Sequence, residues 1–141
     1  MVDKQSAVEL LAGVDLFKGL SKKELRAIAD MAKEMHFSPG QRVVTEGEEG
    51  GRFHMILDGK AKVTVAGRTR NVLGPGAYFG EVSLIDGGPR SATVAAETPL
   101  RTLALAAWNF RPLMKELPGI APKILVEMCR RLRSNEKQVT Q

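Results

Sequence analysis

The sequence is poor in the residues from which extracellular scaffolds and many enzyme sites are built. Its 141 residues include one cysteine and two histidines. Cys129 has no second cysteine in the chain with which to form a disulfide, which is typical of proteins from a reducing compartment. We therefore predict a cytoplasmic location.

Long apolar runs are also missing. No stretch approaches the roughly 20 consecutive apolar residues that a membrane-spanning helix needs. The first residues, 1–6, lack the apolar core of a secretory signal. We expect no membrane span.

The few histidines and the single cysteine argue against catalysis. His36 and His54 are not in His-x-His spacing and have no cluster of carboxylate ligands beside them, so a metalloenzyme of the cupin type, which is also a glycine-rich β-roll, is disfavoured. Cys129 falls in a helical pattern with neither histidine near it in sequence, so nucleophilic catalysis has no support. We expect no enzyme activity and no metal.

What is present is the composition of one globular domain. Hydrophobic residues make up 43% and charged residues 26%, and the length suits a single domain over 1–141. The net charge of +5 and the isoelectric point near 9.6 fit either an anionic partner or a solvated basic surface.

Hydrophobic periodicity divides the chain into three parts. Helical spacing covers residues 7–34, where Ser21 and Glu24 have the spacing of a capping box, and it returns over residues 107–136. Between them, over residues 35–106, short β-rich runs alternate with glycine and proline turns. The fold class is therefore predicted as α+β, an antiparallel, jelly-roll-like β-roll with N-terminal and C-terminal helices.

Two local expectations follow from these patterns. Asp58-Gly59 separates two strand-like runs and predicts a hairpin. The C-terminal helical part predicts two sets of apolar residues, a core set of Trp108, Phe110 and Leu113 and one face of the last helix formed by Ile120, Ile124, Leu125, Met128 and Leu132.

The segment from Phe79 to Val94, which we call the cassette, carries the functional signal. Glycine at 80 frees the backbone, a helical turn from Glu81 points its first amides forward, and Arg90 adds a fork of donors that suits two phosphate oxygens. Glu81 would repel a phosphate but would accept a hydrogen bond from a sugar hydroxyl. A ligand that carries both ribose and phosphate satisfies both residues; an ordinary Glu81–Arg90 ion pair beside simple turns is the alternative.

The string Phe-Gly-Glu followed by Pro-Arg-Ser-Ala-Thr-Val resembles the phosphate-binding cassette of the cyclic nucleotide-binding domain family. This family includes the catabolite activator proteins, the regulatory subunits of protein kinase A and the cyclic nucleotide-gated channels. The resemblance extends over nearly the whole chain, with weaker matches at 16–21, 39–48 and 56–59. It departs from the family at Gly51, where an acid or amide is frequent, and at His54, where an aromatic residue is usual.

The resemblance implies roles for the cassette residues. Arg90 would contact the cyclic phosphate and Glu81 the ribose 2′-hydroxyl. Gly80, Val82, Ser83 and Ala92 would contribute mainly backbone groups, with the Ser83 hydroxyl as an extra donor. Phe79 and Ser91 are the other predicted ligand-binding residues of the cassette. Serine at 91, where cGMP-selective members often have threonine, leaves both bases open, and we favour cAMP over cGMP.

The resemblance also implies how binding becomes a signal. The last helix, from Gly119 to about Asn135, would close over the base as a lid, and Leu84 would act as the hydrophobic hinge. Arg131 matches a position from which an arginine caps the base in one branch of the family, with Arg130 as its rival. The same helix could serve a protein partner or a homodimer.

Three other interpretations of the chain are kept. It could be a regulatory domain excised from a larger channel, transcription regulator or enzyme, or a dimerisation module that has lost its ligand. A DNA-binding regulator is the third, but no recognition helix follows the last helix before Gln141, so we expect no sequence-specific nucleic-acid binding.

Overall fold

The computed structural model describes residues 2–49 and 51–140, with side chains up to Asn135. Its residues form two compact units, which are described in turn. The sheet unit contains Met31–Arg111 together with Val2, and the helical unit contains Asp3–Asp30 and the chain from Pro112 onward. The prediction of a single domain over 1–141 stays a prediction.

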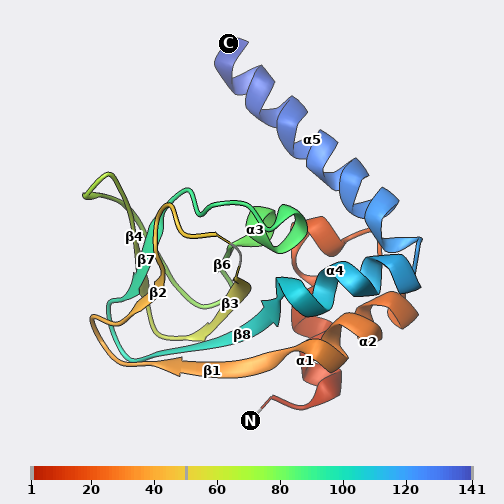
Figure 1. The fold of residues 1–141 in the computed structure, drawn as a ribbon, viewed down its shortest axis with the longest axis horizontal. Coiled ribbons are helices and arrows are strands. Elements are labelled where there is room, and N and C mark those ends of the chain that lie inside the picture. Colours follow the sequence, from red (N-terminus) through yellow and green to blue (C-terminus); the bar gives the residue numbers. More distant parts are fainter. Residues whose placement is uncertain (1, 50, 141) are drawn as a thin grey trace. The chain divides into compact units, whose positions relative to one another are not determined.

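The sheet unit is built from two four-stranded sheets in which all strand pairs are antiparallel (Figure 1). The first sheet has the order β1 (Lys33–Phe37), β8 (Leu100–Ala106), β3 (Arg52–Asp58) and β6 (Tyr78–Phe79). The second has the order β2 (Arg42–Val44), β7 (Thr93–Ala96), β4 (Ala61–Val65) and β5 (Arg68–Leu73). The predicted antiparallel β-roll is confirmed.

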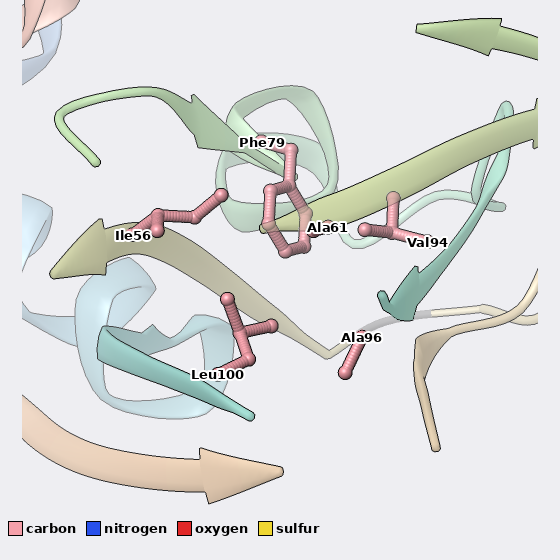
Figure 2. Packing of buried hydrophobic residues seen from close by; sticks show 6 residues of the cluster. All are labelled: Ile56, Ala61, Phe79, Val94, Ala96 and Leu100. Atoms are coloured by element: carbon pink, nitrogen blue, oxygen red, sulfur yellow. The ribbon is translucent and has the colours of Figure 1, made fainter. Parts of the chain in front are cut away.

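The core of the sheet unit lies between the two sheets. Figure 2 shows one buried cluster of this core, with three residues from each sheet: Ile56, Phe79 and Leu100 from the first, and Ala61, Val94 and Ala96 from the second. Because Phe79 begins the cassette and Val94 ends it, both ends of the cassette are fixed in this core.

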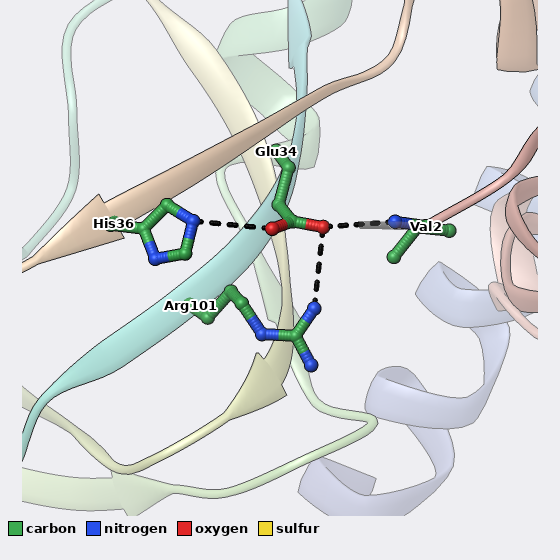
Figure 3. A network of polar contacts seen from close by, with 4 residues as sticks. All are labelled: Val2, Glu34, His36 and Arg101. Atoms are coloured by element: carbon green, nitrogen blue, oxygen red, sulfur yellow. Dashed lines mark hydrogen bonds and ion pairs between the residues drawn. The ribbon is translucent and has the colours of Figure 1, made fainter.

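A polar network lies on β1 and β8. The Glu34 carboxylate accepts hydrogen bonds from the Val2 amide at 3.1 Å and from Arg101 Nη1 at 3.3 Å. It also contacts His36 Nε2 at 3.1 Å (Figure 3). Since His36 and Arg101 are cross-strand partners, Glu34 ties the two strands and Val2 together.

The hairpin predicted at Asp58-Gly59 is wrong. The strands on its two sides, β3 and β4, belong to different sheets and do not pair. The hairpin lies one strand later, where Val65 pairs with Arg68 across Ala66 and Gly67. A tight-turn dipeptide marks a change of chain direction, but it does not specify which strand becomes the neighbour.

The helical unit contains α1 (Lys4–Ala12), the 3₁₀ turn η1 (Asp15–Phe17), α2 (Lys22–Met31) and α5 (Ile120–Thr140). α4 (Ala107–Glu116) contributes its last residues to this unit and its first residues to the sheet unit. The N-terminal helices were predicted over 7–34. In the structure they begin earlier, at Lys4, and end earlier, at Met31, because strand β1 begins at Lys33. No helix among the described residues is long and apolar enough to cross a bilayer.

The apolar positions expected in the C-terminal part are only partly buried. Phe110 and Leu113 are buried as predicted, whereas Trp108 is 58% exposed. On α5, Ile120 and Ile124 are buried, but Leu125 and Leu132 are 62% and 61% exposed. The predicted apolar face of α5 is thus divided, and a partner or homodimer on its exposed part stays a prediction.

The predicted capping box opens α2. Glu24 Oε1 accepts the Ser21 amide at 2.9 Å, and Ser21 Oγ accepts the Glu24 amide at 3.2 Å. The same carboxylate oxygen lies 2.7 Å from Lys123 Nζ on α5. The Lys123 hydrogen bond and, after it, the Ser21 amide hold the pKa of Glu24 below its usual 4.5, against the opposing effect of burial.

We predict that Glu24→Gln lowers the free energy of unfolding by roughly 1 kcal/mol at pH 7. Because the folded-state pKa is lowered, the charge of Glu24 stabilises the fold above pH 4.5, and this contribution disappears as the pH falls through the lowered value. Urea unfolding at neutral and acidic pH measures the difference, with Glu116→Gln as an exposed control. A difference from wild type that persists unchanged in acid would contradict the prediction.

Candidate functional site

The cassette contains a short helix between two left-handed glycines. Gly80 has φ +85° and caps the start of α3 (Glu81–Asp86), and Gly87 with φ +70° ends it. A Cβ at Gly80 would lie 2.6 Å from the Arg52 carbonyl oxygen and 2.5 Å from Arg90 Nη1. Glycine is required at this position for two reasons: the left-handed backbone conformation, and the close approach of the Arg52 carbonyl oxygen and Arg90 Nη1.

The predicted cassette residues line one cavity of about 340 Å³. All eight contribute to its wall: Phe79, Gly80, Glu81, Val82, Ser83, Arg90, Ser91 and Ala92. Val44, Val63 and Tyr78 also line it and were missed from the sequence. The alternation along 60–65 marks Val63 as an inward-facing residue, but no local pattern shows that it faces this cavity.

Arg90 is the unusual group in this wall. Its side chain is buried, with 7% of the residue exposed, and its Nη2 donates a hydrogen bond to the Arg52 carbonyl oxygen at 2.5 Å. Its Nη1 is buried and has no hydrogen-bond partner among the described residues. Burial lowers the pKa of Arg90, and the negative charge of Glu81 opposes that shift. A guanidinium remains protonated in proteins, so one residue of the cavity wall is a buried cation with one donor that has no acceptor among the described residues.

The other cassette side chains have different surroundings. Ser83 is buried, and its Oγ donates to the Gly88 carbonyl oxygen at 3.2 Å, so its single proton holds the turn after α3. The extra donor expected from Ser83 is thus already engaged. Val82 is largely exposed, Glu81 is half-buried, and Leu84 is packed inside the unit on α3.

The His54 imidazole packs against its neighbours as an aromatic ring. Its ring stacks on Phe79 with centroids 5.3 Å apart and meets Phe37 edge-on at 5.8 Å. Its Nδ1 lies 2.9 Å from the Thr102 hydroxyl oxygen. Burial first, and then the positive charges of Arg90 and Arg52, lower the pKa of His54 to about 3. The imidazole is therefore neutral beside the cavity.

Arg131 belongs to the helical unit. It is half-buried on α5 and lines a cleft of about 330 Å³ with residues of η1 and of α5 itself. Arg130, its rival from the sequence, lies 2.5 Å from the Glu127 carboxylate on the same helix. The base-capping role of Arg131 stays a prediction.

The described residues bring no three histidine, cysteine or acidic side chains together in a way that could hold a metal ion. The site consists of a cavity lined by residues of both sheets and of the short helix α3, together with one buried cation. This combination is a β-roll with a candidate site for a small anionic ligand.

The comparisons with known proteins identify the family. Residues 34–116 match the model of the cyclic nucleotide-binding domain, and the chain belongs to this family. It is 31% identical over 130 residues to the CRP-like cAMP-activated global transcriptional regulator of Mycobacterium tuberculosis, a match that covers 89% of this chain and 58% of the regulator.

Two further similarities support the assignment. A cGMP-dependent protein kinase from Toxoplasma gondii is 39% identical over 89 residues, which cover 63% of this chain and 9% of the kinase. The crystal structure of the N-terminal domain of a transcriptional regulator from Streptomyces coelicolor A3(2) aligns with a TM-score of 0.80 at 30% identity, over 92% of this chain and 94% of that domain. This chain thus spans little more than half of the regulator and a small part of the kinase.

We predict that His54 makes the fold less stable in mild acid. In the unfolded chain the imidazole titrates near 6.5, so between pH 6.5 and about 3 the unfolded state binds the additional proton. The free energy of unfolding then falls by about 1.4 kcal/mol for each pH unit below 6.5, or about 2 kcal/mol at pH 5. His54→Phe should remove this dependence.

The measurement is urea unfolding of wild type and variants at pH 7 and pH 5. His36→Gln, a change at the exposed histidine, should keep the wild-type pH dependence. If His54→Phe loses as much stability between the two pH values as wild type does, the imidazole is not held neutral in the folded state.

Proposed function

We propose that the chain is a sensor that binds a cyclic nucleotide, cAMP in preference to cGMP, in the cavity of the cassette. The observation that carries the proposal is Arg90, a residue in the wall of a cavity of about 340 Å³ whose buried Nη1 has no acceptor among the residues that the structure describes. Leaving a buried charged donor unsatisfied is costly, and a phosphate oxygen would relieve that cost.

The charges of the cavity wall favour a cyclic phosphate over other nucleotides. Among the described residues that line it, Arg90 is the single cation and Glu81 the single anion. A cyclic phosphate diester carries one negative charge, which one guanidinium balances. A nucleoside triphosphate carries several negative charges and would find no further cation in this wall, while Glu81 would repel it.

The ribose and the base have their own candidate partners. The Glu81 carboxylate can accept a hydrogen bond from the ribose 2′-hydroxyl. Ser91 also lines the cavity, and we assign to it the discrimination between bases. Serine at this position leaves both bases open, and the preference for cAMP is supported by the 31% identity to a cAMP-activated regulator over 89% of this chain. The contacts assigned to Phe79, Gly80, Val82, Ser83 and Ala92 are part of the same proposal.

The signal would be a movement of α5. A ligand shifts a conformational equilibrium only as far as its affinities for the two states differ, so some element must contact the ligand in one state alone. We assign this role to α5 as the lid and to Leu84 on α3 as the hinge. A cytoplasmic location, a regulatory role without catalysis and the absence of sequence-specific DNA binding stay predictions.

Titration calorimetry with cAMP, cGMP, 5′-AMP and ATP tests the ligand. We expect cAMP to bind most tightly, cGMP more weakly and ATP not measurably. Arg90→Ala should weaken cAMP binding by on the order of 100-fold, since it removes charge-assisted hydrogen bonds to the phosphate, and Arg90→Lys should lie in between.

The matched control is Arg70→Ala, which removes an exposed arginine from β5 and should leave the affinity unchanged. If wild type binds neither cyclic nucleotide, the sensor proposal fails. If Arg90→Ala binds cAMP as tightly as wild type, the phosphate site has been misplaced. Equal or tighter binding of cGMP would refute the cAMP preference alone.

The lid is tested by changing the arginines of α5 one at a time. Arg131→Ala should weaken cAMP binding about fivefold, as expected for the loss of a guanidinium stacked on the base. Arg133→Ala, at an exposed position of the same helix, serves as the control. An equal loss from Arg130→Ala alone would transfer the role to Arg130, and no loss from either would remove base capping from the proposal.

A further inference from the structure

The two residues Gly51 and Arg52, at the start of β3, contact both the cassette and the first turn of α4. The Arg52 carbonyl oxygen accepts the hydrogen bond from Arg90 Nη2 at 2.5 Å. The Gly51 carbonyl oxygen accepts the amide of Ala107 at 3.0 Å. The Arg52 guanidinium lies 4.8 Å from the centre of the Trp108 ring system. We call these two residues the connector.

Gly51 makes room for the Arg90 side chain. A Cβ at this position would lie 2.5 Å from Arg90 Nη2 and 3.4 Å from its Cζ. The φ of +108° at Gly51 is also one that residues with a side chain rarely adopt. Since the obstructed atoms form the far end of a flexible side chain, a methyl group here would displace the guanidinium more readily than the backbone.

The two glycines flank opposite ends of the Arg90 fork. Gly51 faces Nη2, which is held by the Arg52 carbonyl oxygen, and Gly80 faces Nη1, which has no acceptor. Gly51 and Arg52 also line a second cavity of about 130 Å³, and Arg90 contributes to both cavities. The connector thus holds one nitrogen of the fork, while the other has no hydrogen-bond partner among the described residues.

On the side of α4, the connector contacts Trp108 through the Arg52 side chain. Trp108 is the one tryptophan of the sequence and lies in the first turn of α4, where it is 58% exposed. A cation over an indole face is attracted to it, so the Arg52 side chain gives this exposed ring a defined neighbour. A shift of the Arg52 backbone would move the guanidinium over the ring.

We propose that the connector positions Arg90 for the cyclic phosphate and transmits the occupancy of the cavity to Trp108 in α4. When a phosphate engages Nη1, the guanidinium adjusts, and its hydrogen bond from Nη2 carries the adjustment to Arg52 and from there to the indole. The inference rests on the proposed function and assigns positioning and coupling roles to residues outside the cassette.

The positioning role is tested by Gly51→Ala. Calorimetry should show cAMP bound at least tenfold more weakly than by wild type. The matched control is Gly40→Ala, at another left-handed glycine with φ +85° and no atom within 4 Å of an added Cβ. This control should bind within about twofold of wild type, and thermal unfolding should show both variants folded.

A double-mutant cycle separates positioning from a general effect on the fold. In an Arg90→Lys background the Nη2 atom is absent, so adding Gly51→Ala should weaken cAMP binding by less than about threefold. If Gly51→Ala costs the same factor in both backgrounds, or costs nothing in wild type, the positioning role is wrong.

The coupling role is tested by the emission of Trp108. Titration of wild type with cAMP should change the emission in a saturable way, with the same midpoint as in calorimetry. At ligand concentrations that calorimetry shows to be saturating, Arg52→Ala should lose most of this response, and Arg52→Lys should restore part of it.

The outcomes separate the two proposals. If wild type binds no cyclic nucleotide, both the proposed function and the connector fall. If wild type binds cAMP but Gly51→Ala binds as tightly, only the connector falls. An emission response that is absent in wild type, or unchanged by Arg52→Ala, refutes the coupling to α4.

Discussion

The buried guanidinium of Arg90 is the constraint on which the arrangement of the cavity depends. A permanent cation in this position needs acceptors, and the protein supplies one, the Arg52 carbonyl oxygen, to one end of the fork. The cassette is shaped to admit this side chain: Gly80, the residue that caps the start of α3, has no Cβ, and a Cβ there would collide with the arginine. The tight loop at Gly80 is therefore as much a part of the anion site as the arginine is.

The sequence predicted those features that depend on neighbouring residues. The capping box at Ser21 needs contacts over one helical turn only, and it forms as expected. The eight cassette residues lie within 14 positions, 79–92, so the loop that brings them together is encoded locally. Pattern and resemblance were sufficient for the β-roll, because strand spacing and turn residues repeat along residues 35–106.

For features that depend on contacts between distant parts of the sequence, the predictions were wrong or absent. The strands beside Asp58-Gly59 pair elsewhere, because neighbours in a sheet are chosen by the packing of the whole roll. Trp108 has the helical spacing of a core residue, yet its side chain is largely exposed. Its neighbour is the guanidinium of Arg52, a residue that is distant in the sequence. Val44 and Val63 reach the cavity from strands of the second sheet, and no short motif marks them.

His54 has a consequence for the conditions in which the site can work. It stacks on the first residue of the cassette and contacts a buried hydroxyl, and its proton is lost well below neutrality. A histidine with its ordinary titration would add a second positive charge near the guanidinium whenever the surroundings became mildly acidic. Held neutral, it contributes no such charge, so the field around Arg90 does not change through this residue in mild acid.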